Sequence, residues 1–329
     1  MLGKKLAIDP GTSTLRVLVR GEQQLITEPS LVAAAGDDAS HILAAGNASF
    51  PATRGGEAQL VAPVHDGALG DLAAFEALLQ FAVTRGAGRQ RIFKPDIMVA
   101  VMSAMSGRDR RTLMEIAVRA GARTTYLIDA PLAAATGAGL PITTGHGHLV
   151  IDAGGGKTDI AVISLESMIV SRTVRRGGRH IDAAIARYLS STYGLGVSAA
   201  VAEDVKLEIG AAAPLPEERR LVVRGGDDVE ASVSSTEIGE VVREQLQDLG
   251  AALRDVLAET PGSLLADIRH DGALLTGNAA RLRGFDRWVS ALIGAPVRVA
   301  GEPETCVVRG VGAALDNLDV MRRNFLYIR

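Results

Sequence analysis

Short apolar runs alternate with longer segments of helical periodicity along this chain. The runs at 96–102 and 126–128 have the length of buried strands. Residues 71–84 place apolar side chains three or four positions apart, as an amphipathic helix does, and 108–120 predict a second helix with charged residues on one side. Strands and helices that alternate in this way predict an α/β fold.

Two segments of the chain repeat one layout. In residues 6–19 an apolar run ends at Asp9, a turn with glycine and threonine follows, and a second apolar run begins. Residues 148–165 repeat this order with Asp152 in the place of Asp9, 143 residues later. Each segment is typical of a strand–turn–strand hairpin, so the chain is predicted to contain two copies of one βββα-type unit.

The end of the first copy is marked by a helix start and a glycine-rich stretch. Asp129 suits the N-cap of a helix and Pro131 suits its first turn. Residues 137–147 are rich in Gly, Pro and Thr, which favours a hinge or a domain boundary.

Composition narrows the class of protein. The 329 residues are 47% hydrophobic and 22% charged, which excludes disorder for most of the chain. Lys and Arg number 35 against 38 Asp and Glu, a net charge of −3 that offers no large field to nucleic acid. Cys306 is the single cysteine, which excludes a disulfide framework or a cysteine-based zinc site. We expect no nucleic-acid partner.

The sequence predicts neither a secretion signal nor a membrane-spanning helix. Residues 1–9 reach an acid before an apolar signal region forms. The most apolar helical stretch, 72–83, is interrupted by Glu76 and Gln80. We expect a cytoplasmic protein that is soluble or bound peripherally to the inner face of the cell membrane.

The segment Gly-Gly-Gly-Lys-Thr at 154–158 has some similarity to a P-loop. That motif requires a glycine at position 151, which is Ile, and a helix after the loop. Residues 160–163 are typical of a strand instead. A P-loop is therefore not the preferred interpretation.

The two hairpins predict a different phosphate chemistry. Consecutive N–H groups of a Gly-rich turn form an anion-binding concavity, and two such turns facing each other would hold a polyphosphate from both sides. Asp9 and Asp152 would then hold Mg²⁺ through water, because Mg²⁺ keeps most of its hydration shell. The alternative is two ordinary hairpins whose Asp and Thr side chains bond their own turns.

These motifs carry a resemblance to a known family. The segments that begin at Asp9 and Asp152 resemble the two phosphate loops of the actin, sugar kinase and heat-shock ATPase superfamily, and residues 272–286 resemble its adenosine motif. In detail the chain is similar to MreB, the bacterial actin. Further segments in that family's order are 28–32, 63–67, 93–95, 129–135, 202–210 and 301–303.

The resemblance implies an actin-like, ribonuclease H-like duplicated fold whose two domains have a nucleotide cleft between them. Domain I is expected at 1–140, with a small subdomain inserted at about 33–65 and residues 311–329 returning to it. Domain II is expected at 141–310, with a small subdomain inserted at about 182–241.

The resemblance also implies ATP or ADP with Mg²⁺ as cofactors. It places the β-phosphate at the first loop, the γ-phosphate at the second, further phosphate contacts from the second domain, and the ribose and base beside a helix and the adenosine motif. Glu203 and Lys206 share one helix face, and the alternative for them is an exposed charged helix. The residues implied for the first loop are Gly11, Thr12 and Ser13, and those for the second loop are Gly154, Gly155 and Gly156. The further phosphate contacts come from Gly177 and Gly178. The ribose and base lie beside Glu203 and Lys206 of the helix and beside Gly277, Asn278 and Ala279 of the adenosine motif.

Three departures from the family pattern bear on activity. Ala130 stands where the family has the Glu that positions the attacking water, and Asp129, the remaining catalytic candidate, is one position early and is explained by N-capping. Asn278 and Ala279 replace two glycines, which predicts backbone strain and weaker nucleotide binding. Lys157 replaces a usual Thr, and either adds a cation near the phosphates or points to solvent.

Ile92 and Phe93 lie among three cations in residues 89–94. This composition suits insertion into an anionic membrane surface, where each cation contributes about 1 kcal/mol. In MreB-like proteins the corresponding loop contacts the membrane. The alternative is that Phe93 begins a buried strand.

The resemblance therefore implies an ATP-binding protein that polymerises into membrane-associated filaments, as paired protofilaments, with cell-shape and cell-wall synthesis proteins as partners. Ala130 adds the expectation of slow or impaired hydrolysis, a weak ATPase at most. Two alternatives stay open: a small-molecule kinase of the same fold, and a filament scaffold independent of nucleotide.

Overall fold

The computed structural model describes residues 3–22, 24–36, 41–54, 56, 58–88, 93–226, 229–318 and 326–328. The chain divides into two compact units. Unit 1 comprises residues 1–145, 165–168 and 304–329, and unit 2 comprises residues 146–164 and 169–303. The sequence predicted the two main domain boundaries at 140/141 and 310/311, and it did not predict that residues 165–168 belong to unit 1. That return follows from backbone bonds, because the N–H groups of Leu165 and Glu166 donate to the carbonyls of Thr144 and Ile142.

Unit 1 is built on a six-stranded mixed sheet. Its order is β18-β10-β9-β1-β2-β3. The first hairpin, β1 with β2, is antiparallel as predicted, whereas β1 with β9 and β9 with β10 are parallel. The strands are β1 (Lys5–Pro10), β2 (Thr14–Val19), β3 (Gln24–Pro29), β9 (Asp96–Val101), β10 (Thr124–Asp129) and β18 (Leu326–Ile328).

Unit 2 has a five-stranded sheet with the same plan. Its order is β13-β12-β11-β16-β17, in which the hairpin β11–β12 is antiparallel and β11, β16 and β17 are parallel. In unit 1 the strands β3-β2-β1-β9-β10 follow the same plan, with an antiparallel hairpin beside two further parallel strands. This agreement confirms the predicted duplication. The strands are β11 (His148–Ala153), β12 (Thr158–Ser164), β13 (Ser167–Val174), β16 (Ala273–Thr276) and β17 (Val297–Val299).

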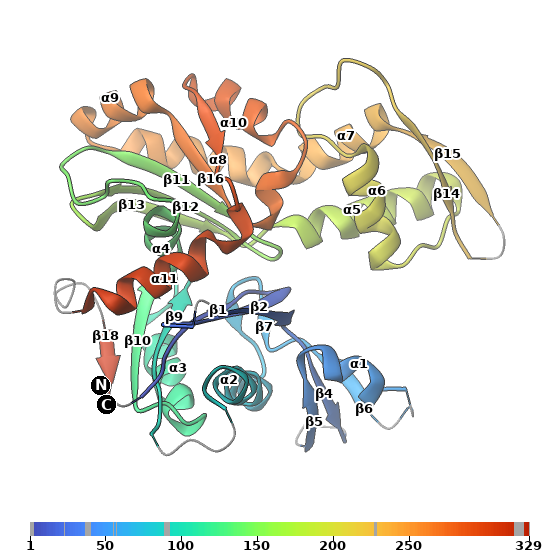
Figure 1. The fold of residues 1–329 in the computed structure, drawn as a ribbon. Helices are drawn as coiled ribbons and strands as arrows, with labels where there is room; N and C mark the ends of the chain where they lie inside the picture. The colour runs from blue at the N-terminus through green and yellow to red at the C-terminus, as the bar shows by residue number, and fades with distance from the viewer. Residues whose placement is uncertain are drawn as a thin grey trace. The chain divides into compact units, whose positions relative to one another are not determined.

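Helices cover both faces of the unit 1 sheet, because alternate strand residues point to opposite faces. Leu6 of β1 meets α2 (Leu72–Ala87) beside Gly86, whereas Leu18 of β2 meets α11 (Cys306–Asp316) beside Gly312. Helix α3 (Gly107–Arg119) joins the first layer, and α4 (Ala130–Gly137) packs along α11 in the second (Figure 1). Cys306 is buried at the start of α11.

The predicted helix at 71–84 is α2, and it forms for local reasons. Asp71 is its N-cap, whose carboxylate accepts the N–H of Ala74 at 2.8 Å. Phe75, Leu78 and Leu79 recur on one face and are fully buried. This burial joins α2 to the hairpin of β1 and β2.

Each unit also carries a smaller, partly separate group of elements. In unit 1 it is a three-stranded sheet of β4 (Val32–Ala35), β5 (His41–Ala45) and β6 (Ala58–Val61), with the short helices η1 (Gly46–Ala48) and α1 (Ser49–Ala52). The pair β7 (Val64–His65) and β8 (Ala68–Leu69) follows it.

In unit 2 the smaller group is a helix cluster with the hairpin of β14 (Arg220–Arg224) and β15 (Glu230–Ser234). Its helices are α5 (Gly178–Tyr193), α6 (Ala199–Ile209) and α7 (Ser235–Gln245). The rest of unit 2 is covered by α8 (Gln247–Glu259), α9 (Gly262–Asp271) and α10 (Phe285–Ile293), with the turn helices η2 (Asn278–Arg281) and η3 (Pro303–Thr305) beyond β16. In the part of the chain that the structure describes, no helix is long and apolar enough to cross a membrane.

Candidate functional site

The turns of the two predicted phosphate hairpins close in the same way. Between β1 and β2 the N–H of Gly11 donates to the carbonyl of Thr14 at 3.1 Å. Between β11 and β12 the N–H of Gly154 donates to the carbonyl of Lys157 at 2.8 Å. The strand β12 follows the second turn, which confirms that 154–158 is not a P-loop. Each unit therefore presents one tight, glycine-initiated loop at the end of its first strand.

Gly177 and Gly178 hold the second loop in place. The N–H groups of Gly178 and Arg179, at the start of α5, donate to the carbonyls of Gly154 and Gly155 at 3.0 and 2.8 Å. A Cβ on Gly177 would stand 2.4 Å from the carbonyl oxygen of Gly154, so only glycine allows this approach. Gly177 and Gly178 therefore contact the second loop, and the first N–H groups of α5 hold that loop in place.

Gly178 is also the place where other predicted site residues of unit 2 meet. A Cβ on Gly178 would lie 3.4 Å from the ammonium nitrogen of Lys206 and 3.9 Å from the Cβ of Ala279. Lys206 comes from α6 and Ala279 from η2, and both approach the start of α5. Four distant segments, namely the loop, α5, α6 and η2, therefore bring predicted residues to one point.

Lys206 is held mainly by an acid that the sequence did not single out. Its Nζ lies 2.6 Å from Oδ1 of Asp182, 3.9 Å from Oε1 of Glu203 and 3.5 Å from the carbonyl oxygen of Gly178. Burial raises the pKa of Asp182, although the hydrogen bond and charge of Lys206 oppose that rise. Glu203 is mostly exposed, so it is the outermost member of this group.

The adenosine motif is less strained than expected. Gly277 has φ +83°, and a Cβ there would stand 2.2 Å from the carbonyl oxygen of Ala153, so glycine is required. Asn278 and Ala279 lie in the 3-10 helix η2 and are not among the described residues with positive φ. The expectation that Ala279 strains the backbone is therefore wrong, because within residues 277–279 the positive φ falls on Gly277.

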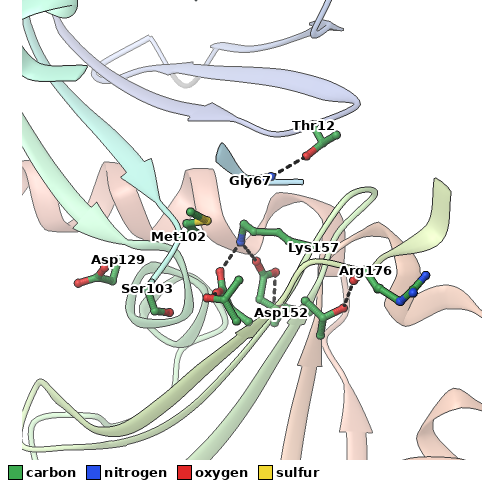
Figure 2. A network of polar contacts seen from close by, with 12 residues as sticks. Thr12, Gly67, Met102, Ser103, Asp129, Asp152, Lys157 and Arg176 are labelled. Atoms are coloured by element: carbon green, nitrogen blue, oxygen red, sulfur yellow. Dashed lines mark hydrogen bonds and ion pairs between the residues drawn. The ribbon is translucent and has the colours of Figure 1, made fainter. Parts of the chain in front are cut away.

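Asp152 lies in a buried polar cluster on the hairpin of unit 2 (Figure 2). Its Oδ1 accepts the hydroxyl of Thr276 at 2.9 Å, and its Oδ2 is 3.7 Å from Nζ of Lys157. Lys157 also forms an ion pair with Asp159, whose other oxygen accepts the hydroxyl of Thr173. The side chain of Lys157 is 16% exposed, so the alternative that it points to solvent is wrong.

The corresponding loop of unit 1 has a simpler arrangement. Asp9 faces Arg16 of β2, with 3.9 Å between Oδ2 and Nη1. The hydroxyl oxygen of Thr12 accepts the N–H of Gly67 at 3.3 Å, which ties the loop to the turn between β7 and β8 (Figure 2). Ser13 is exposed at the tip of the loop.

Asp129 occupies the N-cap position of α4, but its carboxylate makes no capping hydrogen bond. It forms an ion pair with Arg110 of α3 instead. N-capping was therefore the wrong explanation, because the guanidinium offers a charge-assisted bond stronger than a backbone N–H does. Ala130 follows it, 4% exposed, at the first position of the helix.

Comparison with known proteins now identifies the family. The sequence profile of the MreB/Mbl protein family matches residues 3–323. The chain belongs to the MreB/Mbl family. The cell shape-determining protein MreB of Escherichia coli (strain K12) is 36% identical over 339 aligned positions, which cover 97% of this chain and 95% of that protein. The cell shape-determining protein Mbl of Bacillus subtilis (strain 168) is 31% identical, with 99% and 100% covered.

Solved structures agree with this assignment. The crystal structure of MreB5 of Spiroplasma citri bound to ADP has a TM-score of 0.87 at 28% identity, over 98% of this chain and 99% of that one. The MamK double helical filament has a TM-score of 0.80 at 18% identity, over 95% and 98% of the two chains. The second likeness concerns the fold alone. The actin-like fold predicted from the sequence is confirmed.

The hydrated magnesium ion expected for an MreB-like protein fits these carboxylates. Within the described residues no group of three or more His, Cys, Asp or Glu side chains is placed to hold a metal directly. Asp9 and Asp152 each face a side-chain cation, yet a carboxylate has about four lone-pair sites and retains capacity for the water of a hydrated ion. Hydrated Mg²⁺ is therefore compatible with both positions.

The predicted membrane loop is described only in part. Ile92 lies outside the described residues. Phe93 is 48% exposed, so the alternative that it begins a buried strand is wrong, and β9 begins at Asp96.

Sequence reasoning missed the partners of the predicted residues: Arg16, Arg110, Asp159, Asp182 and Thr276. A signal existed for two of them. Arg16 and Asp159 each stand seven positions after the hairpin aspartate and lie opposite it in the register. The others come from distant segments, and no local pattern marks them.

Proposed function

We propose that this protein binds ATP and ADP and polymerises into cytoskeletal filaments that act in cell shape. The observation that carries the proposal is the convergence at Gly178 of the second glycine loop, α5, Lys206 and Ala279. The N–H groups of such a loop suit the phosphates of a nucleotide, and Lys206 and Ala279 beside it are suited to the ribose and base. The cell-shape role is supported by the family, and self-association by the likeness to the MamK filament.

Nucleotide binding is further supported by the MreB5 structures, one bound to ADP and one to AMPPNP. In the proposed site, the first loop contacts the β-phosphate and the second loop the γ-phosphate. Gly177 and Gly178 act by holding the second loop. Lys206, Glu203 and residues 277–279 contact the ribose and base, and Asp9 and Asp152 hold Mg²⁺ through its water. When bound, the ion supplies positive charge to the phosphates.

Hydrolysis is proposed to be slow. Ala130 has no group that could orient water, and Asp129 is occupied by Arg110. A general base must come within hydrogen-bond reach of the attacking water, and no other acid of α4 is available because the helix contains none. The protein is therefore proposed to be a weak ATPase at most.

The filaments are proposed to lie on the inner face of the cell membrane, as paired protofilaments that meet the cell-wall synthesis proteins. Support comes from exposed Phe93, which follows a segment with two arginines and precedes Lys94. An apolar side chain among cations is suited to an anionic lipid surface.

Electron microscopy of the purified protein on an anionic lipid monolayer, with and without ATP and Mg²⁺, tests the proposal. We expect filaments only with nucleotide. Filaments in both conditions would favour the nucleotide-independent scaffold. Absence of filaments in both, together with phosphate transfer to a small acceptor, would favour a kinase.

A further inference from the structure

Two buried acids lie beside Lys157 on the hairpin of unit 2. Asp152 on β11 and Asp159 on β12 lie directly opposite each other in the hairpin register. Their side chains are only 8% and 0% exposed. Like charges at directly opposed positions repel each other, so the hairpin needs a cation at this point. Lys157 supplies it, through its ion pair with Asp159 and its approach to Asp152.

The equivalent cation in unit 1 has a different origin. There the position opposite Asp9 is Arg16, a residue of strand β2. In unit 2 that position is an acid, and the cation belongs to the turn itself. The carbonyl of Lys157 accepts the N–H of Gly154 and closes the loop that is proposed to hold the γ-phosphate. The ammonium of Lys157 is therefore carried by the phosphate loop, whereas Arg16 is carried by a strand.

Each acid keeps another partner if the ammonium turns away from it. The hydroxyl of Thr276 donates to Asp152, and the hydroxyl of Thr173 donates to Asp159. A lysine has three donors on a flexible stem, and the 3.7 Å between its Nζ and Asp152 is longer than a hydrogen bond. The ammonium can therefore keep its ion pair with Asp159 and turn from Asp152 to a phosphate oxygen, because Thr276 still donates to Asp152.

We propose that Lys157 is a built-in counter-cation for the nucleotide phosphates, which supplies part of the charge neutralisation otherwise left to Mg²⁺. The inference rests on the proposed binding of nucleotide. Without Lys157 the two acids present two negative charges beside the phosphates, and with it they present one. Nucleotide binding by this protein consequently depends only weakly on Mg²⁺.

The test is the ratio of the ADP dissociation constants in EDTA and in Mg²⁺, measured by calorimetry. For the unaltered protein we expect a ratio below roughly fivefold. In Lys157→Met we expect the ratio to rise by about tenfold, as the loss of one charge contact at a half-buried site would give. Lys157→Arg, which keeps the charge, should retain the low ratio. Arg220→Met removes one exposed cation from the same unit and should change nothing.

A second variant covers the chance that Lys157→Met unfolds because it leaves the buried Asp159 without its cation. The double variant Lys157→Met with Asp159→Asn keeps the net charge of the cluster but lacks the ammonium. A raised ratio in this variant supports direct contact of the ammonium with phosphate. A ratio as low as that of the unaltered protein overturns the proposal, because charge balance alone would then explain Lys157.

The two proposals fail in different ways. If the unaltered protein binds ADP in Mg²⁺ and loses it in EDTA as strongly as Lys157→Met does, the counter-cation role is refuted and nucleotide binding stands. If it binds ADP in neither solution, the proposed function fails and the role of Lys157 fails with it.

Discussion

Gly310 of α11 lies directly against the backbone of Ala133 in α4. A Cβ built on Gly310 would stand 1.7 Å from the carbonyl oxygen of Ala133. One turn along, a Cβ on Gly137 would stand 1.9 Å from the carbonyl oxygen of Cys306. Each helix thus offers a glycine to the backbone of the other, and this close crossing fixes α4, which begins with Ala130, within unit 1.

Gly310→Ala is expected to destabilise the protein. The methyl group overlaps a backbone atom, which cannot move aside as a side chain can, so the two helices must separate. Overpacking of this kind costs about 3 kcal/mol. Urea unfolding followed by circular dichroism measures it. Gly107→Ala at the start of α3, where a Cβ meets nothing within 4 Å, is the matched control. Equal stability of the two variants would contradict the close crossing.

Ala130→Glu is expected to raise the rate of phosphate release from ATP by roughly tenfold or more, because a positioned base contributes at least that much. Ala130→Gln has the same size without the charge, so the comparison of Glu with Gln isolates the carboxylate. Asp129→Ala is expected to leave the rate within about twofold, since Arg110 holds that carboxylate. A large loss of rate in Asp129→Ala would mean that Asp129 takes part in hydrolysis after all.

Lys206→Met is expected to lower the free energy of unfolding by about 3 kcal/mol in the absence of nucleotide, because it leaves Asp182 buried without a partner. The raised pKa of Asp182 shows that burial already outweighs the attraction of Lys206. The double variant with Asp182→Leu should therefore recover most of the loss. Arg220→Met, from an exposed pair with Glu218, is the control and should cost under about 0.5 kcal/mol. Additive losses in the double variant would refute the coupling.

The fold was largely accessible from the sequence because its signals are local. The hairpins, α2 and the repeat of Asp9 in Asp152 follow from periodicity and turn residues over short windows. Strand β10 is longer than its predicted core at 126–128, since Thr124 and Thr125 extend the ladder to β9 without an apolar signal. Element ends depend on pairing with a distant strand, which a local pattern does not contain.

The candidate site was accessible only in part, for a related reason. Glycines that allow a close approach, such as Gly177 and Gly277, are visible in the sequence, but the backbone that they approach is not. Lys157 shows the same limit. The sequence shows that Lys157 departs from the family pattern. It does not show the ion pair with Asp159, which depends on the hairpin register. Residues are predicted well where the cause is local, and partners from distant segments are found only in the fold.

The double variant Ile92→Ser with Phe93→Ser is expected to lose binding to anionic liposomes. Partial burial of two large apolar side chains in lipid contributes about 2 kcal/mol, which corresponds to more than a tenfold change in binding. Co-sedimentation with vesicles measures the effect. Leu60→Ser, which alters another exposed apolar side chain of unit 1, is the control and should bind normally. Unchanged sedimentation of the double variant would refute the membrane role of this loop.

Glu237 gives the stability of unit 2 a specific dependence on pH. Hydrogen bonds from the Ser234 and Tyr193 hydroxyls lower its pKa from 4.5 to about 2. A carboxyl whose pKa is lower in the folded state stabilises the protein above its unfolded pKa, and this stabilisation is lost as the pH falls from about 4.5 towards 2. The ionised carboxylate completes the capping box of α7 with Ser234 and accepts the hydroxyl of Tyr188 at 2.9 Å.

Glu237→Gln is therefore expected to cost about 1 kcal/mol at neutral pH, the usual contribution of a capping interaction. The difference in unfolding free energy from the unaltered protein should shrink steadily below pH 4.5, because the Glu237 carboxyl of the unfolded chain becomes protonated there while that of the folded protein stays ionised to about pH 2. Tyr188, whose pKa burial and this hydrogen bond raise to about 12, should ionise at lower pH in the variant, as ultraviolet absorbance would record. Glu240→Gln, exposed on the same helix, is the control. A stability difference independent of pH would mean that the shape of the Glu237 side chain matters and its charge does not.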